Sequence, residues 1–192
     1  MIISASSEKK HDPVSAGTHT AICYSVIGIG TQINERFQSA HKQVIIMWEM
    51  CDENIVIDGE EKPKAMSKTY TASLNEKATL RKDLESWRNK AFTPEELKGF
   101  DLQNILGKPC LLSVVEEEKN GNKYSKIASI ASIPKGMNKD MTPVNPLRLF
   151  DICENPRVSP EFANLPEWVQ KRCQESLEWA DANSGDSEDL PW

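Results

Sequence analysis

The sequence lacks the features of membrane, secreted and zinc-knuckle proteins. Its longest apolar runs fall far short of the about 20 residues that cross a bilayer, and no basic segment followed by an apolar one opens the chain. The cysteines are scattered, odd in number and never in a CxxC pair, which argues against a disulfide framework or a zinc knuckle. We therefore expect a soluble, cytoplasmic protein without a membrane partner. Its thiols should be reduced and mostly buried, at Cys23, Cys51, Cys110, Cys153 and Cys173.

Catalytic and cofactor-binding patterns are also scarce. The chain has no GxGxxG, no P-loop and no internal repeat, and all its histidines precede the second expected strand. His19 and Cys23 are four residues apart, but strand geometry separates them by about 13 Å, too far to share a metal. The sequence therefore indicates a protein that is not an enzyme and has no cofactor or metal. A nuclease site made of two carboxylates is the open alternative.

Net charge is absent from most of the chain and concentrated at its end. Residues 1–142 carry 19 basic and 19 acidic side chains and residues 143–172 carry four of each, so the last twenty residues hold the whole formal charge of −6. An acidic peptide with an aromatic end can imitate a nucleic-acid backbone or dock on partner proteins. The expected partner-binding residues are Asp186, Glu188, Asp189, Leu190, Pro191 and Trp192.

What the chain does contain is a series of β-strand patterns. Residues 18–29 form the first expected strand, which Gly28 and Gly30 end or bend. Residues 43–50 form the second and are apolar on both faces over most of their length, and residues 68–72 form a third, more exposed strand. One face of the first strand is expected to carry Thr20, Ile22, Tyr24 and Val26.

Helical spacing begins after the third strand. Residues 73–76 match a capping box and precede an apolar stripe, which predicts an amphipathic helix over residues 74–90. Residues 93–96 predict the start of a second, short helix, and residues 101–106 predict one more turn. The stripe of the first helix consists of Leu80, Leu84 and Trp87.

Two further strands, 110–115 and 123–133, are joined across a tight turn at Asn120-Gly121. Three strands, a helix and a hairpin within about 120 residues follow the element order of an OB barrel. We therefore expect a mainly β fold, a five-stranded OB-fold barrel in residues 1–142 with a helical insertion between strands 3 and 4. Residues 143–180 are expected to form a Pro-rich linker and a C-terminal helix over 166–180, and residues 181–192 a disordered acidic tail ending in Trp.

Aromatic and basic side chains interleave along the expected barrel. Single-stranded nucleic acid is held by aromatic faces that stack bases and by Lys and Arg that contact phosphates, and strands 2 and 3 form the usual binding face of an OB barrel. Tyr70 is the best stacking candidate, whereas Trp48 fits the core equally well and Trp87 fits it better. The lysines at 62, 64 and 68 fit a solvated loop equally well. The candidate DNA-binding residues are Arg36, Phe37, Lys42, Trp48, Lys68, Tyr70, Lys123, Tyr124 and Lys126.

Several segments resemble bacteriophage-encoded single-stranded DNA-binding proteins. The most specific is Tyr70 to Arg88, and shorter ones are Trp48-Glu49, Phe92-Thr93, residues 99–102 and 106–110, and Leu165-Pro166-Glu167-Trp168. The resemblance covers about residues 17–180. It implies an OB fold, sequence-independent binding of single-stranded DNA and a role in phage DNA replication or recombination in the host cytoplasm. The ending Asp186 to Trp192 is similar to the acidic tips of such proteins, which typically end in Phe.

These features predict a non-catalytic single-stranded DNA-binding protein whose tail recruits replication or recombination proteins. The tail can also fold back into the basic groove, so its removal is expected to tighten DNA binding. The rival hypothesis is a non-catalytic OB-fold adaptor for proteins, whose binding face would be more apolar at its centre and poorer in Lys. An oligomer is compatible with either hypothesis.

Overall fold

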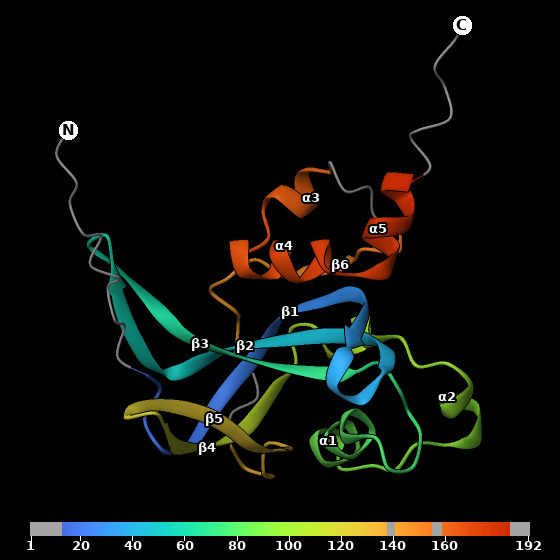
Figure 1. Cartoon of the computed structure of the whole chain (residues 1–192). Coiled ribbons are helices and arrows are strands. Elements are labelled where there is room, and N and C mark those ends of the chain that lie inside the picture. Colours follow the sequence, from blue (N-terminus) through green and yellow to red (C-terminus); the bar gives the residue numbers. More distant parts are fainter. Residues whose placement is uncertain (1–12, 138–140, 155–158, 185–192) are drawn as a thin grey trace, which may run out of the picture.

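The computed structural model describes residues 13–137, 141–154 and 159–184, and shows a mainly β protein built on one sheet (Figure 1). The strands pair antiparallel in the order β3-β2-β1-β4-β5, and β3 approaches β5, so the five strands form a nearly closed barrel. This arrangement is consistent with an OB-like barrel. The strands are β1 (Gly17–Asn34), β2 (Ser39–Ile57), β3 (Glu60–Thr71), β4 (Pro109–Lys119) and β5 (Asn122–Ala131).

The first strand is longer than expected because it bends instead of ending at its glycines. Its pairing with β2 shifts register between Cys23 and Ser25 and again between Gly28 and Thr31. The expectation that Thr20, Ile22, Tyr24 and Val26 share one face is wrong, because the first bulge moves Val26 to the inside, where Cys23 also lies. The tight turn at Asn120-Gly121 is confirmed, and a similar turn at Asp58-Gly59 joins β2 to β3; φ is positive at all four residues.

Short helices and turns connect the strands. The helix after β3 begins later than expected, because Ser73 caps only a local turn by accepting a hydrogen bond from the Asn75 N–H, 3.2 Å away. The predicted buried stripe of Leu80, Leu84 and Trp87 is confirmed, and Thr93 starts the next helix with a capping box, as predicted. These elements are α1 (Thr79–Arg88), α2 (Pro94–Lys98) and the 3-10 turns η1 (Glu35–Phe37) and η2 (Leu102–Ile105).

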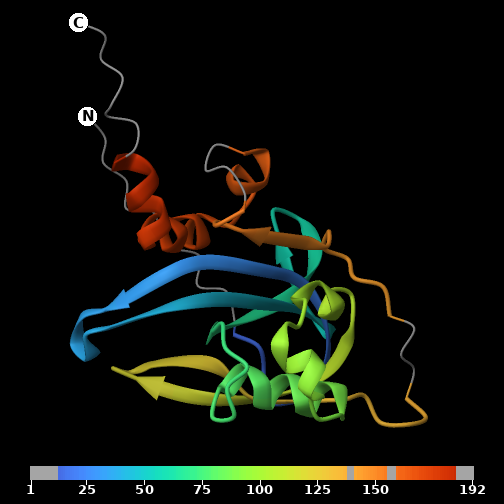
Figure 2. The same ribbon diagram turned by 90° about the vertical axis from the view of Figure 1, so that its right-hand side faces the viewer.

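The C-terminal part packs on the outer face of β1 and β2 (Figures 1 and 2). Its strand pairs parallel with β1, and its helices bury a second apolar cluster with Ile27, Ile45 and Met47. The segment expected to be a linker and one helix over 166–180 therefore contains a strand and three helices, and its last helix continues to Ser184. These elements are β6 (Arg148–Asp151), α3 (Pro160–Ala163), α4 (Glu167–Gln174) and α5 (Leu177–Ser184).

Polar contacts fix this cover to the end of β1. The Glu178 carboxylate accepts hydrogen bonds from the Thr31 N–H at 2.7 Å and from the Thr31 hydroxyl at 2.8 Å. Gly30 makes the close approach possible, because a Cβ at this position would lie 2.6 Å from the Glu178 carboxylate. The cover is thus part of the folded body. Among the described residues, no helix is both long and apolar enough to cross a membrane.

Candidate nucleic-acid interface

The structure places two predicted stacking residues inside the barrel. Trp48 is 0% exposed and packs against Trp87, with ring centroids 5.9 Å apart. Tyr70 is 3% exposed, and its hydroxyl donates to Asp83 Oδ2 at 2.8 Å. A base cannot stack on a ring whose faces are already covered by the core. We therefore remove both residues as base-stacking candidates, as a correction to the sequence-based hypothesis.

Lys68 contacts the same Asp83 carboxylate, and this pair is only partly buried. Its Nζ atom lies 2.7 Å from Asp83 Oδ2 and 5.2 Å from the centroid of the Tyr70 ring. Burial and the Asp83 carboxylate raise the pKa of Tyr70 far above its usual range, so its hydroxyl keeps its proton and the hydrogen bond to Asp83. The Lys68 side chain therefore links α1 to β3 and is less available to bind a ligand at the surface.

The hairpin of β4 and β5 carries three further predicted residues, and each faces a carboxylate on the opposite strand. Lys123 pairs with Glu116 at 2.8 Å, Lys126 pairs with Glu117 at 2.9 Å, and the Tyr124 hydroxyl donates to Glu117 at 2.6 Å. The hydrogen bond from Tyr124 is the largest cause that lowers the pKa of Glu117, and the bond from Lys126 adds to it. The positive charge of this hairpin, the β4–β5 arm, is therefore locally balanced.

The β1–β2 turn presents an exposed aromatic ring beside a cation. Phe37 is 69% exposed in η1, and the Arg36 guanidinium carbon lies 5.5 Å from its ring centroid. The turn is shaped by Asn34, whose side chain accepts a hydrogen bond from the Phe37 N–H, and by the left-handed Gln38. Gly17, at the start of β1, pairs with Val114, and β4 continues from there to the arm, while the end of β1 leads into η1. This turn and the β4–β5 arm therefore lie at opposite ends of β1.

An open polar groove follows the end of β3 and the loop leading to α1. Strand alternation turns His41 and Thr71 to the outside, whereas Val44 and Tyr70 face the inner core. Within the described ranges, His41 and Lys77 form no ion pair with a carboxylate, and both are exposed. The groove thus combines hydroxyls with uncompensated basic groups. We call it the polar groove, lined by His41, Lys68, Thr69, Tyr70, Thr71, Ser73, Asn75, Lys77, Ala78 and Thr79.

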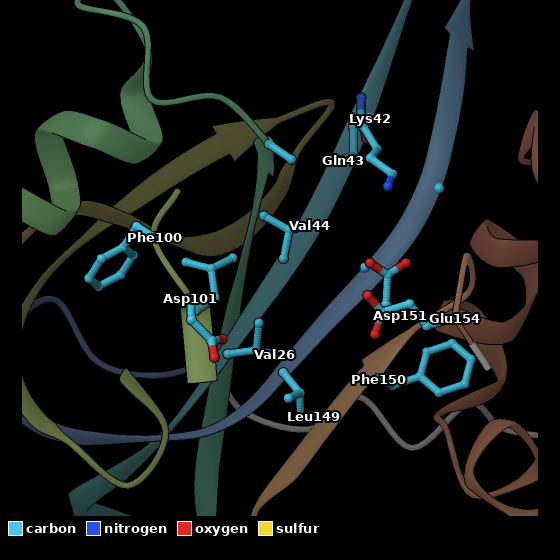
Figure 3. A pocket seen from close by; sticks show the side chains of 14 residues that line it. Val26, Lys42, Gln43, Val44, Phe100, Asp101, Leu149, Phe150, Asp151 and Glu154 are labelled. Atoms are coloured by element: carbon cyan, nitrogen blue, oxygen red, sulfur yellow. The ribbon is translucent and has the colours of Figure 1, made fainter. Parts of the chain in front are cut away.

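Lys42 points into a different cleft, which lies between the barrel and β6 (Figure 3). Apolar side chains such as Val26, Val44 and Leu149 form part of this cleft, and Asp101 and Asp151 bring carboxylates to it. A hydrogen bond with Cys153 is the largest cause that raises the pKa of Lys42. His41 and Lys42 are adjacent in β2, so their side chains point to opposite faces of the strand. Lys42 therefore does not belong to the polar groove.

The predicted residues consequently do not form one site. Arg36 and Phe37 lie at one end of the barrel and Lys123, Tyr124 and Lys126 at the other. Trp48 and Tyr70 are buried, Lys42 is turned to another cleft, and the half-buried Lys68 lines the polar groove. The groove residues His41, Thr71 and Lys77 were missed because the sequence analysis favoured positions where aromatic and basic residues alternate. Strand periodicity next to Lys42 and Tyr70 could have indicated the outward positions His41 and Thr71.

Comparison with known proteins adds no assignment. No family model matches the chain, and no curated protein matches it. The six partner-binding residues expected in the tail, Asp186, Glu188, Asp189, Leu190, Pro191 and Trp192, lie outside the described residues.

Proposed function

We propose that this chain is a non-catalytic, sequence-independent single-stranded DNA-binding protein that acts in phage DNA replication or recombination. The observation that supports it most is the polar groove at the end of an OB-like barrel, whose exposed His41 and Lys77 have no carboxylate partner in the described ranges. OB folds bind oligonucleotides on the face of strands 2 and 3 and on the loops that join strands 1 to 2 and 4 to 5, and the groove takes residues from β2 and β3. Its hydroxyl and basic side chains are of the kinds that bind the phosphates of a nucleic-acid backbone.

In this proposal the DNA backbone follows the groove and a base stacks near the β1–β2 turn. Lys77 and Arg36 neutralise phosphates, and the hydroxyls of Thr71 and Ser73 donate hydrogen bonds to them. Phe37 offers an exposed ring to a base, and such stacking is worth about 1–3 kcal/mol. Hydrogen bonds to base edges are not required, which fits binding without sequence preference.

The acidic tail has two proposed roles, recruitment of replication or recombination proteins and competition with DNA. The contact between Glu178 and Thr31 fixes α5 near the end of β1, a few residues before η1. The start of α5 therefore lies at the same end of the barrel as Arg36 and Phe37. In this proposal the tail, which follows α5, competes with DNA for the basic groups of the groove.

Fluorescence anisotropy of labelled oligo-dT tests the function directly. The wild-type chain is titrated at low and moderate salt, with duplex DNA of equal length as competitor. We expect salt-sensitive binding with a log-log slope of about 0.7 per phosphate contact, which duplex fails to displace. No binding under either condition would reject the proposal and favour the protein-interaction adaptor.

A further inference from the structure

One tryptophan of the C-terminal cover has no place in either core. Trp48 and Trp87 pack against each other, and Trp179 packs against Phe162 with centroids 5.1 Å apart. Trp168, on α4, is 47% exposed, and within the described residues its ring meets no other aromatic ring and no cation. About half of this aromatic ring is therefore accessible to a ligand.

Helix α4 reaches the β2–β3 strand pair next to the polar groove through Arg172. Val169 and Cys173 face the barrel and are buried in the outer apolar cluster with Ile45. The Arg172 guanidinium donates to Gln43 Oε1 at 3.1 Å, and Gln43 pairs with the groove residue Thr71. Because residues four apart lie on the same side of a helix, Trp168 lies one turn from Arg172 along that side.

The other residues of α4 that reach the surface are charged or polar. Lys171 is exposed and belongs to no ion pair in the described ranges, while Arg172 makes a long contact of 3.4 Å with Glu175. Such an exposed pair contributes little to stability. Glu167, also exposed, is the one acidic neighbour of Trp168 in the sequence. A protein-binding surface would instead be apolar at its centre and poor in Lys.

We propose that α4 forms the second wall of the DNA-binding groove, with Trp168 as a base-stacking residue and Lys171 as a phosphate contact. The inference rests on the proposed function and extends it from the barrel to the C-terminal cover. In this arrangement one strand of DNA runs between the β3–α1 loop and α4, with bases stacked on Phe37 and Trp168. The cover then has a binding role besides completing the fold.

Photocrosslinking tests this placement. Full-length protein is irradiated with an oligo-dT that carries 5-iododeoxyuridine, and the crosslinked peptides are identified by mass spectrometry. We expect a crosslink at Trp168, loss of that crosslink in Trp168→Ala, and affinity about tenfold weaker in this variant, because one stacked base is lost. Trp168→Phe should recover most of the affinity.

Leu177→Ala provides the matched control, since Leu177 is an exposed apolar residue of the neighbouring helix, 37% exposed. Its affinity for oligo-dT should equal that of the wild type. If the wild type binds oligo-dT but Trp168→Ala binds equally well and no crosslink maps to α4, the inference is wrong and the proposed function stands. If the wild type does not bind, both fail.

Discussion

The two ends of the barrel contain similar residues but differ in how their charges are paired. At the β4–β5 arm, Lys123 and Lys126 face Glu116 and Glu117 across the hairpin. At the polar groove, Lys77 and His41 face hydroxyl groups and form no ion pair within the described ranges. Of these two regions, only the polar groove leaves basic groups, those of His41 and Lys77, without carboxylate partners in the described ranges, and for this reason the proposed DNA path follows the groove.

Removal of the exposed aromatic ring at each end of the barrel should give the largest difference in oligo-dT affinity. We expect Phe37→Ala to weaken oligo-dT binding by about 1–3 kcal/mol, because a stacked base loses its platform. Tyr124→Ala, at the arm, should change affinity by less than about twofold, since its hydroxyl is engaged by Glu117. Anisotropy titrations of both variants measure the contrast, and equal losses would place DNA on both ends.

The basic groups provide the next contrast. The double variant Arg36→Ala with Lys77→Ala should bind oligo-dT about tenfold more weakly at low salt and show a shallower salt dependence, by about 0.7 per lost contact. The double variant Lys123→Ala with Lys126→Ala removes the same formal charge. It should leave the affinity for oligo-dT and its salt dependence nearly unchanged. A shallower slope in the arm variant instead would reverse the assignment of the two ends.

Removing the tail should affect the groove alone. A chain ending at Gly185 loses the acidic residues that compete with phosphates, so its affinity for oligo-dT should rise a few-fold at low salt and less at high salt. The same truncation in the Arg36→Ala, Lys77→Ala background should gain less. Identical affinities of the full and truncated chains would remove the autoinhibitory role.

Acid should lower the free energy of unfolding by protonating Glu53, which is paired near the start of β1. This is the smallest effect of the series. Burial alone would raise the pKa of Glu53, but hydrogen bonds from Ser15 and Lys64 outweigh it and lower the pKa to about 2. Because the pKa is lower in the folded state, this stabilisation is complete above about pH 4.5 and is lost as the pH falls toward 2. Chemical denaturation between pH 6 and pH 3 should show a smaller decrease for Glu53→Gln than for the wild type, and equal decreases would contradict the assigned role.

The strand order and the tight turns could be predicted because they follow from local signals. Asn120-Gly121 fixes a two-residue turn, and this turn alone sets Glu117 opposite Tyr124. The charge pairing of the arm was therefore available from the sequence. The bulge after Cys23 was not, because it depends on how β1 pairs with β2.

The sequence indicates that β2 needs a cover on its outer face, but it does not indicate which segment provides that cover. Residues 43–50 are apolar on both faces, so an outer cover was physically required once the barrel interior took Val44 and Ile46. Nothing in the sequence specifies that β6 and α4 supply that cover. For the same reason the proximity of His41 and Lys77, which are distant in the sequence, appears only after the chain has folded.

The most direct test of the account is to observe both ends of the barrel in one titration. Backbone amide shifts of the ¹⁵N-labelled full chain are followed by NMR as oligo-dT is added at low salt. The account predicts that the amides of His41, Thr71 and Lys77 shift, while those of Lys123, Tyr124 and Lys126 remain in place. Shifts confined to the β4–β5 arm, or none at saturating DNA, would contradict it.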